Sequence, residues 1–192
     1  MKHALSLSLL ALTLAGCATT PSPEKVAGLN TDARKTAGGL IQTLGGELKT
    51  ALNASGPGGA IGVCKEKAPQ IAAEAMQKTG FQIKRVSPKN RNPKGVPDAW
   101  ETQAQAELEK RLAAGEKPET LDMHAVVDTP NGKVFRYAKA LVTQPVCLLC
   151  HGATDSMPAE VNSALASQYP ADKATGYSAG QVRGLLSIRK PL

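Results

Sequence analysis

The residues best suited to chemistry are concentrated in one short segment, Cys147-Leu148-Leu149-Cys150-His151. Two cysteines three positions apart, with a histidine directly after the second, are the attachment signature of a c-type haem. The two thiols add across the two vinyl groups of the porphyrin, and the adjacent histidine is carried under the iron as its proximal ligand. The segment therefore predicts one covalent haem c, held by Cys147 and Cys150 and ligated by His151.

A Cys-x-x-Cys pair on its own permits other chemistry. Dithiol redox proteins and zinc sites use the same spacing. A dithiol redox protein or a zinc-binding protein that uses Cys147 and Cys150 is therefore an alternative, and the directly following His151 favours haem over both.

The N-terminus predicts export and lipidation. A basic start is followed by a predominantly apolar stretch of twelve residues, 4–15, too short to span a bilayer but typical of a secretory signal. The sequence Leu14-Ala15-Gly16-Cys17 resembles a bacterial lipoprotein signal, and the absence of Asp at position 18 suggests outer-membrane sorting. We expect a signal peptide over 1–16, lipid on Cys17, a tether over 17–23 and one domain over 24–192, anchored to the periplasmic face of the outer membrane of a Gram-negative bacterium.

The charge balance narrows the choice of partners. The chain has 23 Lys and Arg against 16 Asp and Glu, a net charge of +7, and only 3% aromatic residues. Dispersed charge and few aromatics argue against nucleic-acid binding. The basic balance permits attraction to acidic proteins or to lipid headgroups.

Periodicity predicts helices first and a small antiparallel sheet afterwards, which is an α+β domain. The expected elements are a long N-terminal helix (24–53), a break (55–59), a helix kinked or ended at Pro69 (60–78), a strand (81–86), a helix (98–114), a hairpin (123–129 and 133–142), a short helix (155–168) and a closing strand (184–190).

Three groups of segments carry a family resemblance: Ala60–Cys64 with Ala68-Pro69; Arg85–Ser87, Arg91–Pro93 and Pro97–Glu101; and Cys147–Gly152 with Gly176-Tyr177 and Gly184–Ile188. Together they resemble the family of single-haem, PAS-like c-type domains first catalogued as a domain of unknown function and found in periplasmic sensors. The resemblance implies a PAS-like antiparallel sheet flanked by helices, one covalent haem, and sensing of redox state or a small ligand, here in a stand-alone lipoprotein.

The second axial ligand is expected to be Cys64. We predict that it lies near the start of a helix, where the helix dipole, Lys65 and Lys67 favour the thiolate that binds metals. It also matches the cysteine that the resemblance implies as the distal ligand. His124, in the strand that begins at Met123, is the alternative distal ligand.

Thiolate and imidazole ligation has functional consequences. An anionic sulfur stabilises ferric iron, which lowers the reduction potential. On reduction the cysteine is expected to leave, which opens the iron to CO or NO. We therefore expect a redox or small-ligand sensor, with a single-electron carrier as the alternative and a redox or signalling protein as partner. No acid–base pair accompanies the motif, so we expect no enzymatic turnover.

The haem propionates require cationic partners. Arg85 and Arg91 are the candidates, because guanidinium groups bind carboxylates with two hydrogen bonds. Tyr137 and Tyr177 are further candidates for the pocket.

Overall fold

The computed structural model describes residues 20–192. The expected signal peptide and the lipidation site Cys17 lie outside this range. The helices are α1 (Pro23–Gly62), α2 (Ala68–Thr79), α3 (Ala99–Ala113), α4 (Leu148–His151) and α5 (Ala159–Gln168), with a π-helical turn (Val63–Lys67) and 3-10 turns (Pro93–Gly95, Pro145–Cys147). The strands are β1 (Gln82–Val86), β2 (Asp122–Thr129), β3 (Gly132–Val142) and β4 (Val182–Pro191).

The long N-terminal helix α1 begins where the Ser22 side chain accepts a hydrogen bond from the Lys25 N–H. The break expected over 55–59 is confined to one residue. Gly56 takes a left-handed conformation (φ 69°) and Pro57 starts the next helical stretch. Proline is tolerated in the first turn of a helix, because its missing N–H needs no partner there. The chain therefore bends at Gly56, between two helical stretches of α1.

The disturbance expected at Pro69 takes the form of a wide turn just before it. Over Val63–Lys67 the helix is π-helical, and the Ala68 N–H donates to the carbonyl oxygen of Val63, five residues earlier. Proline lacks an N–H and crowds the preceding turn, which favours such a distortion. Helix α2 then continues to Thr79 and ends at Gly80, which is left-handed.

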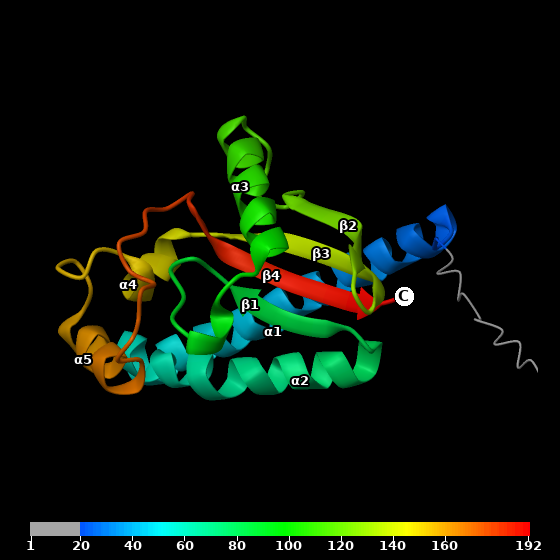
Figure 1. Cartoon of the computed structure of the whole chain (residues 1–192). Coiled ribbons are helices and arrows are strands. Elements are labelled where there is room, and N and C mark those ends of the chain that lie inside the picture. The colour runs from blue at the N-terminus through cyan, green and yellow to red at the C-terminus, as the bar shows by residue number, and fades with distance from the viewer. Residues whose placement is uncertain (1–19) are drawn as a thin grey trace, which may run out of the picture.

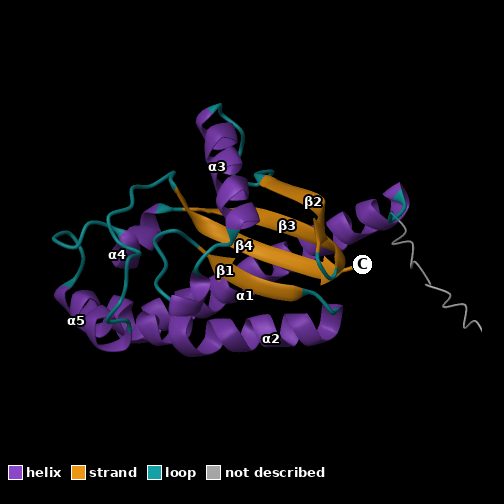
Figure 2. Cartoon of the chain, in the orientation of Figure 1, coloured by secondary structure: helices purple, strands orange, loops and turns teal. Residues whose placement is uncertain are grey.

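The four strands form one antiparallel sheet in the order β1-β4-β3-β2 (Figure 2). All four were expected from the sequence, within two residues at each end. Strands β2 and β3 form a hairpin in which Thr129 pairs with Gly132, whose φ is 106°. The C-terminal strand β4 lies between β1 and β3, so the last residues of the chain complete the middle of the sheet.

Helices cover both faces of the sheet, with α1 and α2 on one face and α3 on the other (Figure 1). Side chains alternate accordingly, because successive strand residues point to opposite faces. Tyr137 and Ile188 are buried in the core beneath α1, whereas Ala138 and Leu185 are buried beneath α3. The α+β prediction, with a flanked antiparallel sheet and a long first helix, is confirmed.

A third, smaller core joins α5 to the end of α1. It contains Ile61, Met157, Val161 and Leu165. Helix α5 begins at Ala159, later than the expected start at 155–156, because Pro158 precedes it and takes an extended conformation. Among residues 20–192, no helix combines the length and the apolar character needed to cross a bilayer.

Candidate functional site

The Cys-x-x-Cys-His segment lies beyond one end of the sheet, between β3 and α5 (Figure 1). A 3-10 turn ending at Cys147 leads into the single turn α4, which ends at His151. Gly152 closes it, and its N–H donates to the Leu148 carbonyl oxygen at 3.0 Å. A Cβ atom at position 152 would lie 2.7 Å from that same oxygen. Glycine is therefore required directly after the histidine.

The imidazole of His151 is held in one orientation. Its Nδ1 lies 2.7 Å from the Ala174 carbonyl oxygen, which can only accept a hydrogen bond. Nδ1 therefore carries the proton, and the lone pair is on Nε2. Histidine ligands of metals commonly have this arrangement, in which a carbonyl or carboxylate fixes the ring through its other nitrogen. The backbone N–H of Tyr177 also donates to the His151 carbonyl oxygen at 2.9 Å, which ties the two segments together.

The surroundings keep His151 neutral. Burial, together with the positive charges of Arg91 and Arg183, lowers the pKa of His151 to about 3. Burial likewise raises the pKa of the Cys150 thiol to about 11. An imidazole without a proton on Nε2 is the form that binds a metal, so His151 has the protonation state that a ligand needs.

Arg91 fastens the turn that bears these residues. Its side chain is 7% exposed. It donates to the Cys150 carbonyl oxygen at 2.6 Å and to the Asp172 carboxylate at 3.0 Å. Its Nη1 is buried without a hydrogen-bond partner among the described residues. Buried donors are rarely left unsatisfied, so this nitrogen is suited to an anionic or carbonyl group placed beside α4.

A second arginine, Arg183, was missed by the sequence analysis. Leu141 pairs with Gly184 and Val142 pairs with Val182, so Arg183 is the extra residue of a β-bulge in β4. Bulges redirect side chains near functional sites. The Nε of Arg183 lies 3.3 Å from Nδ1 of His151. Because Nδ1 already donates to Ala174, this approach places one donor against another and is no hydrogen bond.

The charged guanidinium of Arg183 is held where water solvates it poorly. Burial, with the nearby charges of Arg85 and Arg91, lowers the pKa of Arg183 to about 10, although Tyr177 opposes this. No carboxylate of residues 20–192 lies within ion-pair distance of Arg183. The guanidinium is therefore a partly buried cation that needs an anion. No sequence motif identifies Arg183 as a site residue, because the position of a β-bulge depends on the pairing of two strands that are distant in the sequence.

Tyr177 joins the two arginine-bearing segments. Its hydroxyl is 3.4 Å from that of Ser87, and its ring meets the His151 imidazole edge-on with centroids 6.4 Å apart. Lys89 Nζ lies 4.5 Å from the ring centroid and the Arg183 guanidinium lies 5.5 Å from it. Tyr177 is therefore a neighbour of the motif, whereas Tyr137 is fully buried under α1 and bonded to Asp122.

Cys64 is close to the motif but not at a helix start. It lies within the π-helical turn, about two turns after Pro57, so its expected place near a helix N-terminus is wrong. Burial is the main cause that raises the pKa of Cys150 and of Tyr169, and the charge of Cys64 contributes to both. Cys64, Cys150 and Tyr169 therefore share one neighbourhood.

The two remaining candidates, Arg85 and His124, lie in different parts of the molecule. Arg85 is exposed on β1, and its charge acts on both His151 and Arg183. His124 is exposed on β2, stacks on Phe135 and lines a groove with residues 20–31 of the N-terminal end of α1. That groove and α4 lie at opposite ends of the molecule (Figure 1). His124 is therefore too far away to share a metal with His151. The alternative prediction of His124 as the distal ligand is wrong.

A comparison with known protein families identifies the family to which the chain belongs. The family model described as Tll0287-like matches residues 19–191. The chain belongs to the Tll0287-like family. This is the family that the sequence segments resemble, so that resemblance is confirmed.

A solved relative shares the fold. The crystal structure of the cyanobacterial haem protein Tll0287 matches with a TM-score of 0.64 and 24% identity, over 89% of this chain and 97% of that chain. No curated protein matches this member of the Tll0287-like family.

The residues of this Tll0287-like protein fit a haem. His151 offers a neutral Nε2, two thiols precede it at the attachment spacing, and Arg91 and Arg183 have unused capacity for carboxylates. Among residues 20–192, no three or more His, Cys, Asp or Glu side chains are grouped so that they could hold a metal ion.

Proposed function

We propose that the protein binds one haem covalently through Cys147 and Cys150, with His151 as proximal and Cys64 as distal ligand, and that it senses redox state or a small ligand. The hydrogen bond of His151 to the Ala174 carbonyl is the observation that carries the proposal. It leaves Nε2 as the only ring nitrogen free for a metal, on the residue that directly follows the two thiols. The haem protein Tll0287, which shares the fold, supports the same cofactor.

A haem supplies an iron that changes oxidation state by one electron. The chain supplies the rest. Ala174 and Arg91 hold the His151 segment in place, and Cys64 provides a second, anionic donor. Arg91 and Arg183 are offered to the propionates, with Arg85 as an exposed third cation. Each of these cations stabilises a carboxylate by charge-assisted hydrogen bonds.

Covalent attachment is tested on protein expressed with haem-attachment machinery. The denatured polypeptide is expected to retain haem and to give a c-type pyridine haemochrome spectrum. Cys147→Ser with Cys150→Ser should lose the haem on denaturation, whereas Cys64→Ser should keep it. A colourless wild-type protein would instead favour the dithiol or zinc alternative.

Ligation by Cys64 is tested separately. We expect Cys64→Ser to change the ferric absorption and paramagnetic resonance spectra and to raise the reduction potential, because the anionic sulfur is lost. His124→Ala is the matched control and should leave both unchanged. Unaltered ferric spectra in Cys64→Ser would refute this part of the proposal.

Sensing and electron carriage differ in what happens on reduction. A sensor is expected to lose the Cys64 ligand, to show slow or hysteretic voltammetry, and to bind CO or NO in the ferrous state. A carrier keeps its ligands, so its voltammetry is fast and reversible and CO does not bind. We favour sensing and expect no enzymatic turnover.

Anchoring is proposed from the N-terminal sequence alone. Cleavage before Cys17 and lipidation of its thiol would hold the protein at the periplasmic face of the outer membrane. Cys17→Ser should release the protein from the membrane fraction and abolish labelling by radioactive palmitate. Continued membrane association without labelling would exclude lipid as the anchor.

A further inference from the structure

Most of the net positive charge of the described residues comes from two segments, 85–97 and 169–183. Residues 20–192 contain 22 of the 23 basic residues and all 16 acidic residues, a net charge of +6. The two segments contain six basic residues and one acidic residue, a net charge of +5. The other parts of the described chain are therefore almost neutral.

The two segments form one surface. The Lys173 N–H donates to the Asn90 carbonyl oxygen at 3.2 Å, and the Lys89 ammonium donates to the Thr175 carbonyl oxygen. The single acidic residue, Asp172, is already paired with Arg91 at 3.0 Å. The acid therefore neutralises an inner cation and leaves the outer ones uncompensated.

Four of the six cations are exposed, namely Arg85, Lys89, Lys94 and Lys173. None of them is paired with a carboxylate of the described residues. In the segment 85–97, Val96 is 60% exposed, the largest fraction among the exposed large apolar side chains of residues 20–192. An apolar residue among charged ones is typical of a transient protein interface.

This surface adjoins the proposed haem site. Arg91 reaches from residues 85–97 to the Cys150 carbonyl oxygen, and Tyr177 from residues 169–183 meets the His151 imidazole. A protein bound here would contact the segments that touch the motif itself. Electron transfer between proteins requires this kind of close approach, and opposite charges accelerate the encounter.

We propose that residues 85–97 and 169–183 form the docking surface for an acidic one-electron carrier protein. This rests on the proposed haem function and adds the partner class and the face that it uses. In the exchange, one electron leaves the reduced carrier and converts the ferric iron to the ferrous state, and no covalent bond forms or breaks.

A membrane is the less suitable occupant. The described residues begin at the N-terminal end of α1. This end lies opposite the end where α4 and the segments 85–97 and 169–183 lie (Figure 1). A bilayer that held the chain through its N-terminus would therefore face the other end of the molecule. We accordingly assign the surface to a protein.

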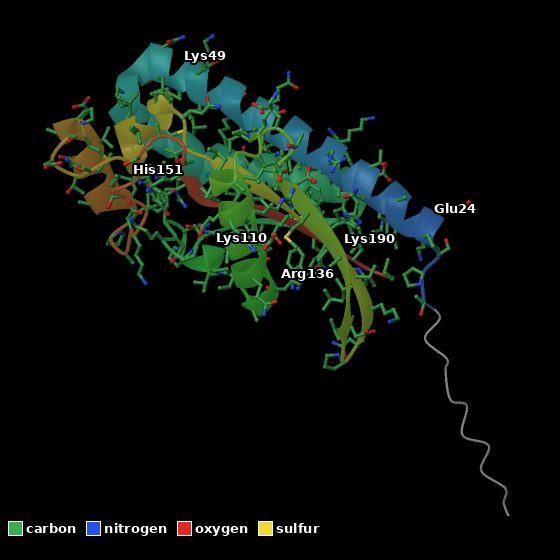
Figure 3. All side chains as sticks on the ribbon, turned by 90° about the horizontal axis from the view of Figure 1, so that it is seen from above. Glu24, Lys49, Lys110, Arg136, His151 and Lys190 are labelled. Carbon is green, nitrogen blue, oxygen red and sulfur yellow. The ribbon has the colours of Figure 1, made fainter. Side chains whose placement is uncertain are left out.

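The test uses the full mature protein and a purified flavodoxin, an acidic one-electron carrier, as the probe. The variant combines Lys94→Glu and Lys173→Glu and leaves Lys89, which holds Thr175, in place. The matched control combines Lys35→Glu and Lys49→Glu, exposed residues of α1 with the same change in net charge. Figure 3 shows Lys49 projecting outward from α1, away from His151.

The first measurement does not require haem. Carbodiimide joins lysines to carboxylates in contact, and mass spectrometry locates the joined residues. We expect the wild type and the control to cross-link to flavodoxin at Lys89, and the surface variant to lose at least about fivefold of that product, because opposite charges no longer hold the probe there. An unchanged Lys89 cross-link in the surface variant, or an equal loss in the control, would overturn the proposal.

The second measurement is the rate at which reduced flavodoxin reduces the ferric protein. We expect a rate about tenfold lower in the surface variant than in the control at about 20 mM salt, converging at about 500 mM because salt screens exposed charges. If the surface variant instead keeps flavodoxin reduction and loses binding to phosphatidylglycerol vesicles, the surface is a membrane site and the proposal fails. Absence of haem would be detected by the haemochrome assay, and the cross-linking result would still decide the docking surface. Should the Glu variant unfold, Lys94→Gln and Lys173→Gln replace it in both measurements.

Discussion

The Ala174 carbonyl oxygen lies 2.7 Å from Nδ1 of His151, and this contact depends on Asp172. The carboxylate of Asp172 accepts hydrogen bonds from the Ala174 N–H at 2.8 Å and from Arg91 at 3.0 Å. One acidic side chain thus holds both the loop that orients the imidazole and the arginine that fastens the preceding turn.

Asp172→Ala should therefore disturb the site through stability and orientation together. We expect the free energy of unfolding to fall by about 3 kcal/mol, because Arg91 is left buried without its counter-charge. Urea denaturation of the haem-free protein measures this, and a change in the ferric spectrum reports the imidazole. Asp155→Ala, in an exposed loop, is the control and should cost less than about 0.5 kcal/mol. Equal stabilities of the two variants would show that the contact is dispensable.

Arg183→Gln should have opposite effects with and without haem. In the haem-free protein we expect a gain of about 1 kcal/mol in the free energy of unfolding, because a desolvated and unpaired cation is removed. In the haem-bearing protein we expect the reduction potential to fall by about 60 mV, since a nearby positive charge favours the ferrous state.

Arg85→Gln provides the comparison for both measurements. It removes the same charge from an exposed position, where water screens it, so both effects should be smaller. A larger shift in potential for Arg85→Gln would mean that Arg183 is not the inner cation of the site.

Gly152→Ala should impair the motif by sterics alone. A Cβ atom there would lie 2.7 Å from the Leu148 carbonyl oxygen. We expect a loss of about 2–4 kcal/mol in the free energy of unfolding, together with a lower yield of attached haem. Gly39→Ala, at an exposed position within α1 where nothing lies within 4 Å, should instead stabilise by up to about 1 kcal/mol. A Gly152→Ala variant as stable as the wild type would show that a Cβ atom fits beside the Leu148 carbonyl oxygen without cost.

Asp122 predicts how stability depends on pH. Burial alone would raise the pKa of Asp122, but hydrogen bonds from Arg34 and Tyr137 outweigh it and hold the pKa below 3.8. The folded state therefore favours the carboxylate, and its contribution is present above pH 3.8 and is lost as the pH falls through the lower folded value. Asp122→Asn should cost about 2 kcal/mol at pH 7 and progressively less in acid. If the cost of Asp122→Asn did not change with pH, the pKa of Asp122 would not be lowered in the folded protein.

The sequence was sufficient for features that depend on local patterns. The hairpin around Gly132, the amphipathic helices and the closing strand were all predicted, because turn residues and periodicity act over short distances. The cysteines and His151 were predicted as site residues for the same reason, since their spacing is itself the signal.

What the sequence left out depends on contacts between distant segments. The role of the Ala174 carbonyl has no residue-type signature, because every residue has a carbonyl. Arg183 reaches the site through a bulge that requires β3 and β4 to pair. His124 was the alternative to Cys64 in the sequence alone, and the position of β2 beside the start of α1 separates it from the motif.

The wide turn at Val63–Lys67 sets the angle between two apolar faces that contact separate cores. Ile61 packs with α5, whereas Met76 packs against the sheet. In an unbroken α-helix these side chains, fifteen positions apart, would differ in direction by roughly 60°, at about 100° per residue. A π-helical turn holds about one more residue than an α-helical turn, so it turns α2 back by roughly 100° and leaves the two side chains roughly 40° apart in the opposite sense. If the same residues formed a regular α-helix, the apolar face of α2 would rotate by roughly 100° away from the sheet core while Ile61 stayed beside α5.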